Sequence, residues 1–336
     1  MREFIIAPRD AGQRADKYVG KVLNQASKNF LYKMIRKKNI VLNDRKMTGQ
    51  EMLKAGDSIK MYFSEDTFAK FSGMSGQNNI VNQYDLCYND PQGKEQGEAS
   101  LLDIVYEDED ILIINKPAGL LSQKAAPGDD SANDRILRYL LESGQLKAAD
   151  LATFHPSVCN RLDRNTSGLL IAGKTMHGLQ ETAAMLKDRS VQKFYRCLVW
   201  GDLEGSAHLS GYLVKDTKTN RVRIIRDAKK HPDAVSIETA YDPIWRYGPV
   251  TLLEVHLITG RSHQIRAHLA SIGHPILGDP KYGDAARDRE LARLGGLHGQ
   301  QLHAYRMEFP DGRTFLAPEP EHMKQVMQYF EEEKEL

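Results

Sequence analysis

The stretch that decides the fold and the chemistry of this chain reads Asn160-Arg161-Leu162-Asp163-Arg164-Asn165-Thr166-Ser167-Gly168-Leu169-Leu170. One acid, Asp163, stands between two arginines in a run of small polar residues, and an apolar run that is typical of a strand follows at once. Nearby positive charge keeps a carboxylate ionised, and an aspartate can act as a nucleophile. Spacing alone nevertheless favours a surface salt bridge in a loop, because most neighbouring Asp and Arg residues do no chemistry.

Around this stretch, residues 101–318 show many short apolar runs and few helical patterns. The strands that we predict are residues 104–106, 111–114, 169–172, 193–200, 235–241 and 251–257, and the helices are residues 136–141, 177–186 and 264–272. Many strands with few helices between them predict an α+β fold with a mixed, largely antiparallel central sheet. Within residues 319–336, apolar side chains recur at helical spacing and predict a C-terminal helix.

Residues 1–63 are predicted to form a small, separate α/β domain. Arg14 opens one helix, Ser27 is placed to cap a second, and residues 40–42 and 58–63 resemble strands. This domain holds fourteen Lys or Arg and six Asp or Glu, a net charge of +8 in a chain whose total is +1. The asymmetry indicates a module that binds a polyanion, although a solvated basic surface without a partner explains the charge alone equally well.

Residues 64–100 are polar and acidic and are expected to form a linker.

Composition also excludes several classes of protein. The three cysteines include no CxxC pair and no window approaches 18 apolar residues, so we expect a cytoplasmic protein with no membrane span. The histidines near residue 263 lack the HExxH spacing of a zinc helix, and no GxxxxGK[ST] loop occurs, so no metal is expected.

Several segments together resemble one known family. Arg161-Leu162-Asp163 followed by Thr166-Ser167-Gly168 is similar to the catalytic motif of the RluA-type family of RNA pseudouridine synthases. Further resemblance lies in Lys193-Phe194-Tyr195, in residues 259–269 with 273–279, and in residues 115–121. Residues 14–17, 35–43 and 56–59 resemble the S-four-like RNA-binding domain, so the resemblance covers nearly the whole chain.

The resemblance implies a role for each matching side chain. Asp163 is the catalytic carboxylate, Arg266 pairs with it, and Tyr195 stacks on the uracil. Arg161 fills the space that a flipped-out uridine leaves, because a planar guanidinium can stack and bond to base edges. The substrate-binding residues that we expect are Arg161, Arg164, Thr166, Arg261, His263 and Lys193. The RNA-binding residues of the N-terminal domain are expected to be Arg14, Lys17, Lys28, Lys33, Arg36, Lys37 and Lys38.

The family's activity is the isomerisation of uridine to pseudouridine in RNA, and its expected target here is large-subunit (23S) ribosomal RNA. Substrate and product are isomers, so no cofactor is expected, and we expect a monomer. Nucleophilic attack at C1′ and a glycal route through C2′ both stay open. So do a transfer RNA target and a catalytically silent ribosome-assembly factor, whereas a glycoside hydrolase is disfavoured because the motif holds a single acid.

Two departures from the family pattern concern the choice of target. Many relatives carry His before the Arg-Leu-Asp run, where this chain has Asn160. A His is also common after the Lys-Pro-Ala-Gly segment, where Ser122-Gln123-Lys124 follows here. Neither change touches Asp163.

Overall fold

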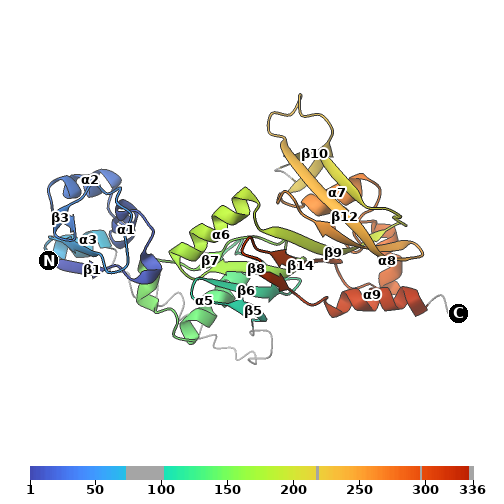
Figure 1. Ribbon diagram of the computed structural model, residues 1–336, viewed down its shortest axis with the longest axis horizontal. Helices are drawn as coiled ribbons and strands as arrows, with labels where there is room; N and C mark the ends of the chain where they lie inside the picture. Colours follow the sequence, from blue (N-terminus) through green and yellow to red (C-terminus); the bar gives the residue numbers. More distant parts are fainter. Residues whose placement is uncertain (73–101, 217–218, 296, 333–336) are drawn as a thin grey trace.

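The N-terminal module is a small sheet covered by helices. The computed structural model describes residues 1–72, 102–216, 219–295 and 297–332. In it, strands β1 (Arg2–Ile5), β4 (Ser58–Met61), β2 (Ile40–Leu42) and β3 (Arg45–Lys46) pair in that order. Helices α1 (Ala15–Val22) and α2 (Lys28–Arg36) pack on this sheet, and the module lies at one end of an elongated molecule (Figure 1).

Local sequence explains the boundaries of these elements. Ser27 caps α2 as predicted, because its Oγ accepts a hydrogen bond from the backbone N–H of Phe30. Lys38 leaves the helix at a φ of 60°, so the left-handed position is held by a lysine. The β2–β3 hairpin turns at Asn43 and Asp44, which both have positive φ, as a tight two-residue turn requires.

A further helix, α3 (Glu65–Ser72), stands at the start of the range expected to form a linker. Its Phe68 is buried in the N-terminal core and Phe71 packs at the edge of that core. The apolar cluster of the N-terminal module therefore continues past residue 63 to the end of α3. The rest of the expected linker, from residue 73, lies outside the described residues.

The large sheet confirms the predicted α+β class. Its strands pair in the order β11-β10-β12-β13-β9-β14-β8-β6-β5, while β15 pairs with β14 and β7 with β8. The bounds are β5 Ile104–Glu107, β6 Ile111–Lys116, β7 Ser157–Val158, β8 Ser167–Gly173, β9 Gln192–Trp200, β10 Ala207–Asp216, β11 Arg221–Ile225, β12 Val235–Tyr247, β13 Val250–His256, β14 Leu302–Glu308 and β15 Thr314–Leu316. Among the pairs that the structure describes, β14–β8 is parallel and the others are antiparallel.

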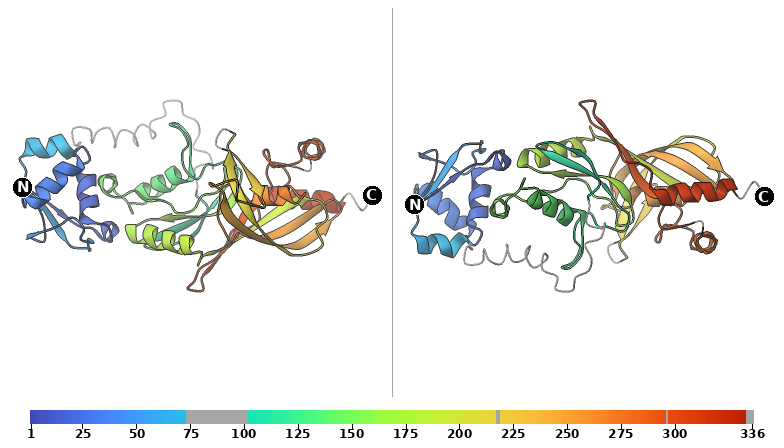
Figure 2. Two further views of the ribbon diagram at one scale, coloured as in Figure 1. Left: turned by 90° about the horizontal axis from the view of Figure 1, so that it is seen from above. Right: turned by 90° about the horizontal axis from the view of Figure 1, so that it is seen from below.

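Helices cover both faces of this sheet. Helices α5 (Ala132–Glu142) and α7 (Gln264–Ser271) pack on the face that carries Tyr195 and Cys197. Helix α6 (Met176–Asp188) packs on the opposite face, where β6 and β8 present their alternate residues. Helices α8 (Ala285–Arg293) and α9 (Glu321–Glu332) cover Leu198 and Trp200 at the end away from the N-terminal module (Figure 2).

The N-terminal module contacts the larger domain through the short helical turn Pro8–Asp10 and the residues just after it. Arg9 Nη1 lies 2.6 Å from Asp150 Oδ2, and Gln180 Nε2 on α6 donates to the carbonyl of Gly12 at 2.9 Å. These contacts join the module to the end of the sheet that carries α5 and α6 (Figure 1).

Candidate active site

The loop between β7 and β8 carries Asp163, and the Thr166-Ser167-Gly168 run at its end is tied to β14 and to the segment just before β14. Gln300 Nε2 donates to Thr166 Oγ1 at 3.1 Å, and Ser167 Oγ lies 2.9 Å from His303 Nδ1. Gly168 has a φ of 107°, and a Cβ at this position would lie 2.2 Å from the Ala304 carbonyl oxygen. The Thr-Ser-Gly run therefore fixes the loop to the centre of the sheet by two side-chain bonds and one close backbone approach.

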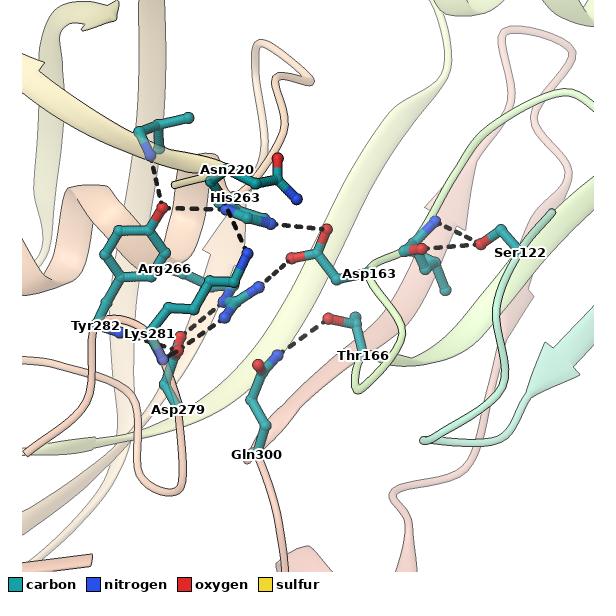
Figure 3. A network of polar contacts seen from close by, with 12 residues as sticks. Ser122, Asp163, Thr166, Asn220, His263, Arg266, Asp279, Lys281, Tyr282 and Gln300 are labelled. Carbon is teal, nitrogen blue, oxygen red and sulfur yellow. Dashed lines mark hydrogen bonds and ion pairs between the residues drawn. The ribbon is translucent and has the colours of Figure 1, made fainter. Parts of the chain in front are cut away.

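A second set of bonds holds the loop from the end of β6 and from the segment that follows it. Ser122 Oγ donates to the Leu162 carbonyl at 2.9 Å and accepts from the Leu162 N–H at 3.0 Å (Figure 3). Lys116 is fully buried, and its Nζ donates to the carbonyls of Pro117, Leu120 and Arg164. Burial lowers the pKa of the Lys116 ammonium to about 7, and the charge of Asp163 opposes that shift. Both neighbours of Asp163 in the chain are thus held through their backbones.

Arg266 on α7 links Asp163 to a second, more deeply buried acid. Its Nη1 donates to Asp163 Oδ2 at 2.6 Å, while Nε and Nη2 donate to the two oxygens of Asp279 at 2.7 Å each (Figure 3). The Asp279 side chain is 0% exposed, that of Arg266 is 5% exposed and that of Asp163 is 27% exposed. Asp163 is therefore the member of this triad that a substrate can reach.

Charge and burial oppose each other in this triad. Burial by itself lowers the pKa of the Arg266 guanidinium, but the hydrogen bonds and charges of Asp279 and Asp163 raise it further than burial lowers it. Burial by itself raises the pKa of Asp279, and the bonds from Arg266 outweigh this effect, so the net shift is downward. Both groups stay charged, and Arg266 presents a permanent positive charge to Asp163.

Tyr195 and His263 complete the surroundings of Asp163. Tyr195 on β9 is buried, and burial together with the charge of Asp163 raises the pKa of its phenol. His263 stands immediately before α7, with Nε2 3.9 Å from Asp163 Oδ1 and Nδ1 3.0 Å from the Tyr282 hydroxyl (Figure 3). The site thus combines one reachable carboxylate, one fixed guanidinium, one aromatic ring and one imidazole.

The structure places the residues predicted from the sequence in three groups and leaves Lys193 apart from them. Asp163, Arg266, Tyr195, His263 and Thr166 lie together at the site. Arg161, Arg164 and Arg261 are exposed on loops beside it.

Lys193 is buried, and its Nζ ends beside Gly260, where an added Cβ would lie 3.9 Å away. It therefore lies next to the loop that carries Arg261.

The basic residues of the N-terminal module form the third group. All seven lie on its surface: Arg14, Lys17, Lys28, Lys33, Arg36, Lys37 and Lys38. Arg14 differs from the rest because its guanidinium is already paired with Asp16, at 3.0 and 2.8 Å.

The structure adds supporting residues to which no role had been assigned from the sequence. They are Lys116, Ser122, Asp279, Tyr282, Gln300 and His303. Lys116 and Asp279 both lie within segments that resemble the family, but a lone lysine or acid in a loop carries no signal of its partner. The pairing of β14 with β8 brings Gln300 to Thr166 and His303 to Ser167. These partners are 134 and 136 positions apart in the chain, so their contact cannot be deduced from local sequence patterns.

Within the described residues, no three His, Cys, Asp or Glu side chains gather in a way that could hold a metal ion. Among the helices of that same part of the chain, none has the length and apolar character needed to cross a bilayer.

Comparison with known proteins identifies the family of this chain. Residues 110–271 match the sequence profile of the RNA pseudouridylate synthase family. The chain is 30% identical to ribosomal large subunit pseudouridine synthase D of Nitrosomonas europaea, over 97% of this chain and 87% of that protein. It is 29% identical to ribosomal large subunit pseudouridine synthase C of Escherichia coli, over 96% of this chain and 94% of that protein.

Solved structures show the same fold. Human RNA pseudouridylate synthase domain containing 4 superposes with a TM-score of 0.56 at 20% identity, covering 77% of this chain and 98% of that one. Human RNA pseudouridylate synthase domain containing 1 gives a TM-score of 0.52 at 22% identity, covering 67% of this chain and 86% of that one. With a relative at 30% identity along almost its whole length, the chain belongs to the RluA-type family of RNA pseudouridine synthases.

Proposed function

We propose that this protein isomerises uridine to pseudouridine in large-subunit (23S) ribosomal RNA, with Asp163 as the catalytic carboxylate. The observation that carries the proposal is the partly exposed Asp163, held by Arg266 beside the buried ring of Tyr195. The names of the relatives, which are ribosomal large subunit pseudouridine synthases, support the choice of RNA.

The reaction moves one glycosidic bond. The bond from uracil N1 to ribose C1′ breaks, C1′ bonds to C5, and the C5 proton leaves for N1, so atoms and charge balance without a redox partner. Asp163 either attacks C1′ or removes a proton from C2′, and both routes need a charged carboxylate against the ribose. Arg266 keeps that carboxylate ionised and oriented, and Tyr195 offers an aromatic face to the uracil.

The target nucleotide must leave its helix, because C1′ is inaccessible inside a stack. In this proposal Arg161 occupies the vacated space, while Arg164, Thr166, Arg261, His263 and Lys193 bind the extruded nucleotide and its phosphates. The basic surface of α1 and α2 anchors RNA through phosphate contacts. The protein acts as a monomer in the cytoplasm and needs neither a metal nor a cofactor.

Chemical mapping of pseudouridines tests the proposal. Ribosomal and transfer RNA from cells with and without the protein should differ at one or more uridines of 23S RNA, and the purified protein should restore those sites on unmodified transcripts. A difference confined to transfer RNA would move the activity to the other RNA class. Identical maps, together with inactive purified protein, would favour a silent assembly factor.

A further inference from the structure

His263 occupies a costly backbone position next to the catalytic carboxylate. Its φ is 55°, in the left-handed region that residues with side chains seldom adopt, and it starts helix α7 without capping it through its side chain. Its side chain is 11% exposed, so it is held in place with Nε2 directed at Asp163. Such strain near reacting groups points to a specific use of the imidazole.

The hydrogen bonds of Tyr282 decide which nitrogen of His263 carries the proton. The Val222 backbone N–H donates to the Tyr282 hydroxyl oxygen at 2.8 Å, so the single hydroxyl hydrogen is left for His263 Nδ1 at 3.0 Å. This arrangement favours Nδ1 as the acceptor of the Tyr282 hydroxyl hydrogen, which puts the proton of the neutral imidazole on Nε2. Burial lowers the pKa of His263, with Arg266 and Lys281 adding to the effect and Asp163 opposing it, which agrees with a neutral ring.

The gap between His263 and Asp163 has the size of one hydroxyl group. Asp163 Oδ2 is occupied by Arg266, whereas Oδ1 faces Nε2 at 3.9 Å, too far for a direct hydrogen bond (Figure 3). An oxygen about 2.8 Å from each atom fits between them. It must donate to a carboxylate and accept from an N–H at once, and among RNA groups a hydroxyl does both.

We propose that His263 Nε2–H and Asp163 Oδ1 together bind the ribose 2′-hydroxyl of the target nucleotide, and that Tyr282 sets the tautomer that makes this possible. The inference rests on the proposed function, since a carboxylate that acts at C1′ or C2′ lies beside the 2′-hydroxyl. The pair thereby distinguishes a ribonucleotide from a deoxyribonucleotide at the reacting position.

The test compares two inert RNAs that carry pseudouridine at the mapped target position, one with ribose and one with 2′-deoxyribose there. Neither turns over, so fluorescence anisotropy gives equilibrium affinities. The wild-type protein should bind the ribose form about tenfold more tightly, as expected for the loss of one to two hydrogen bonds. Equal affinity of the wild-type protein for both RNAs would overturn the proposal without any variant.

Two variants then assign the effect to His263. His263→Asn tolerates the positive φ but ends its donor near the Nδ1 position, so it should weaken binding of the ribose form about tenfold and of the deoxy form less than twofold. His263→Gln carries an amide N–H to the Nε2 position and should restore most of the discrimination. His177→Asn, an exposed histidine on α6, should leave both affinities unchanged.

Two results would refute the role of His263. One is an equal loss for both RNAs in His263→Asn, which would show that the residue does not act through the 2′-hydroxyl. The other is a His263→Gln protein with wild-type thermal unfolding and no discrimination. Failure of the proposed function is seen separately, because the wild-type protein would then form no pseudouridine at all.

Discussion

At the scale of single residues, the site depends on an unequal sharing of Arg266 between two acids. Asp279 takes two of its donors in a fully buried pair, and Asp163 takes one at the edge of the site. The two acids therefore have different roles: Asp279 fixes the position of the guanidinium, and the guanidinium in turn orients Asp163. Replacement of each acid should have a different consequence.

Asp163→Asn should abolish pseudouridine formation while RNA affinity falls by about tenfold at most, because the carboxylate supplies one of the hydrogen bonds to the target ribose. The amide keeps the size of the side chain but loses the charge and the nucleophilic oxygen, so turnover should fall by more than about a thousandfold. Single-turnover assays with labelled uridine RNA, together with filter binding, separate the two quantities. Normal turnover in this variant would refute the assignment of the carboxylate.

Asp279→Asn should damage the fold as well as the activity. Removal of one partner from a buried ion pair leaves the other charge poorly compensated, and the free energy of unfolding should fall by about 3 kcal/mol or more. Urea unfolding measures this change, with Asp233→Asn in an exposed loop as the control. A free energy of unfolding within 0.5 kcal/mol of wild type (about the scatter of surface substitutions) would show that the Asp279–Arg266 pair contributes little to stability.

At the scale of elements, strand β6 places Lys116 beneath the loop that carries Asp163. Its ammonium pKa of about 7 lies below the value of about 10.4 expected in the unfolded chain. Between these values the unfolded state binds the extra proton, so the free energy of unfolding rises with pH by up to about 1.4 kcal/mol per unit. The cost of burying the charged form is present in full below pH 7.

Lys116→Met should remove this dependence. The difference in unfolding free energy between wild type and the variant should shift in favour of wild type as the pH rises from 6 to 9, and the groups common to both proteins cancel. Urea unfolding at several pH values gives this difference. Parallel curves would mean that the three carbonyl acceptors keep the ammonium protonated throughout.

Elements with strong local patterns were predictable from sequence, and those shaped by the sheet were not. The cap at Ser27, strands β8 and β9 and helix α9 follow from side-chain chemistry and spacing. Hairpin β10–β11 was missed because β10 is only half buried along most of its length. Helix α8 was missed because Leu291 is its one buried residue in the described structure.

The candidate site divides in the same way. Asp163, Tyr195 and Arg266 could be named from their motifs, since each lies in a run of residues that resembles the family. Asp279 and Gln300 could not be assigned roles, because each acts through a partner from a distant part of the chain. Pairing of distant segments depends on the packed sheet, which short-range patterns do not report.

At the scale of the whole molecule, the basic module and the active site lie in different parts of an elongated structure (Figure 1). We expect the module to contribute affinity and the catalytic domain to contribute chemistry. Lys33→Ala with Arg36→Ala on α2 should weaken RNA binding and lower the slope of log affinity against log salt by about 1.5, for two phosphate contacts.

A matched pair on α8, Arg289→Ala with Arg293→Ala, removes the same charge at the far end and should leave that slope unchanged. Fluorescence anisotropy over a salt series measures both pairs. Equal slopes for the α2 pair and wild type would contradict the anchoring role of the module.

The buried ion pair between Asp279 and Arg266 has a consequence for an enzyme that binds a polyanion. RNA brings many phosphate groups close to the site. A guanidinium that was not held in place would form ion pairs with these phosphates instead of with Asp163. The buried Asp279 carboxylate accepts two hydrogen bonds from Arg266 and fixes the position of the guanidinium. Arg266 therefore keeps its hydrogen bond to Asp163 when the phosphates of RNA come near.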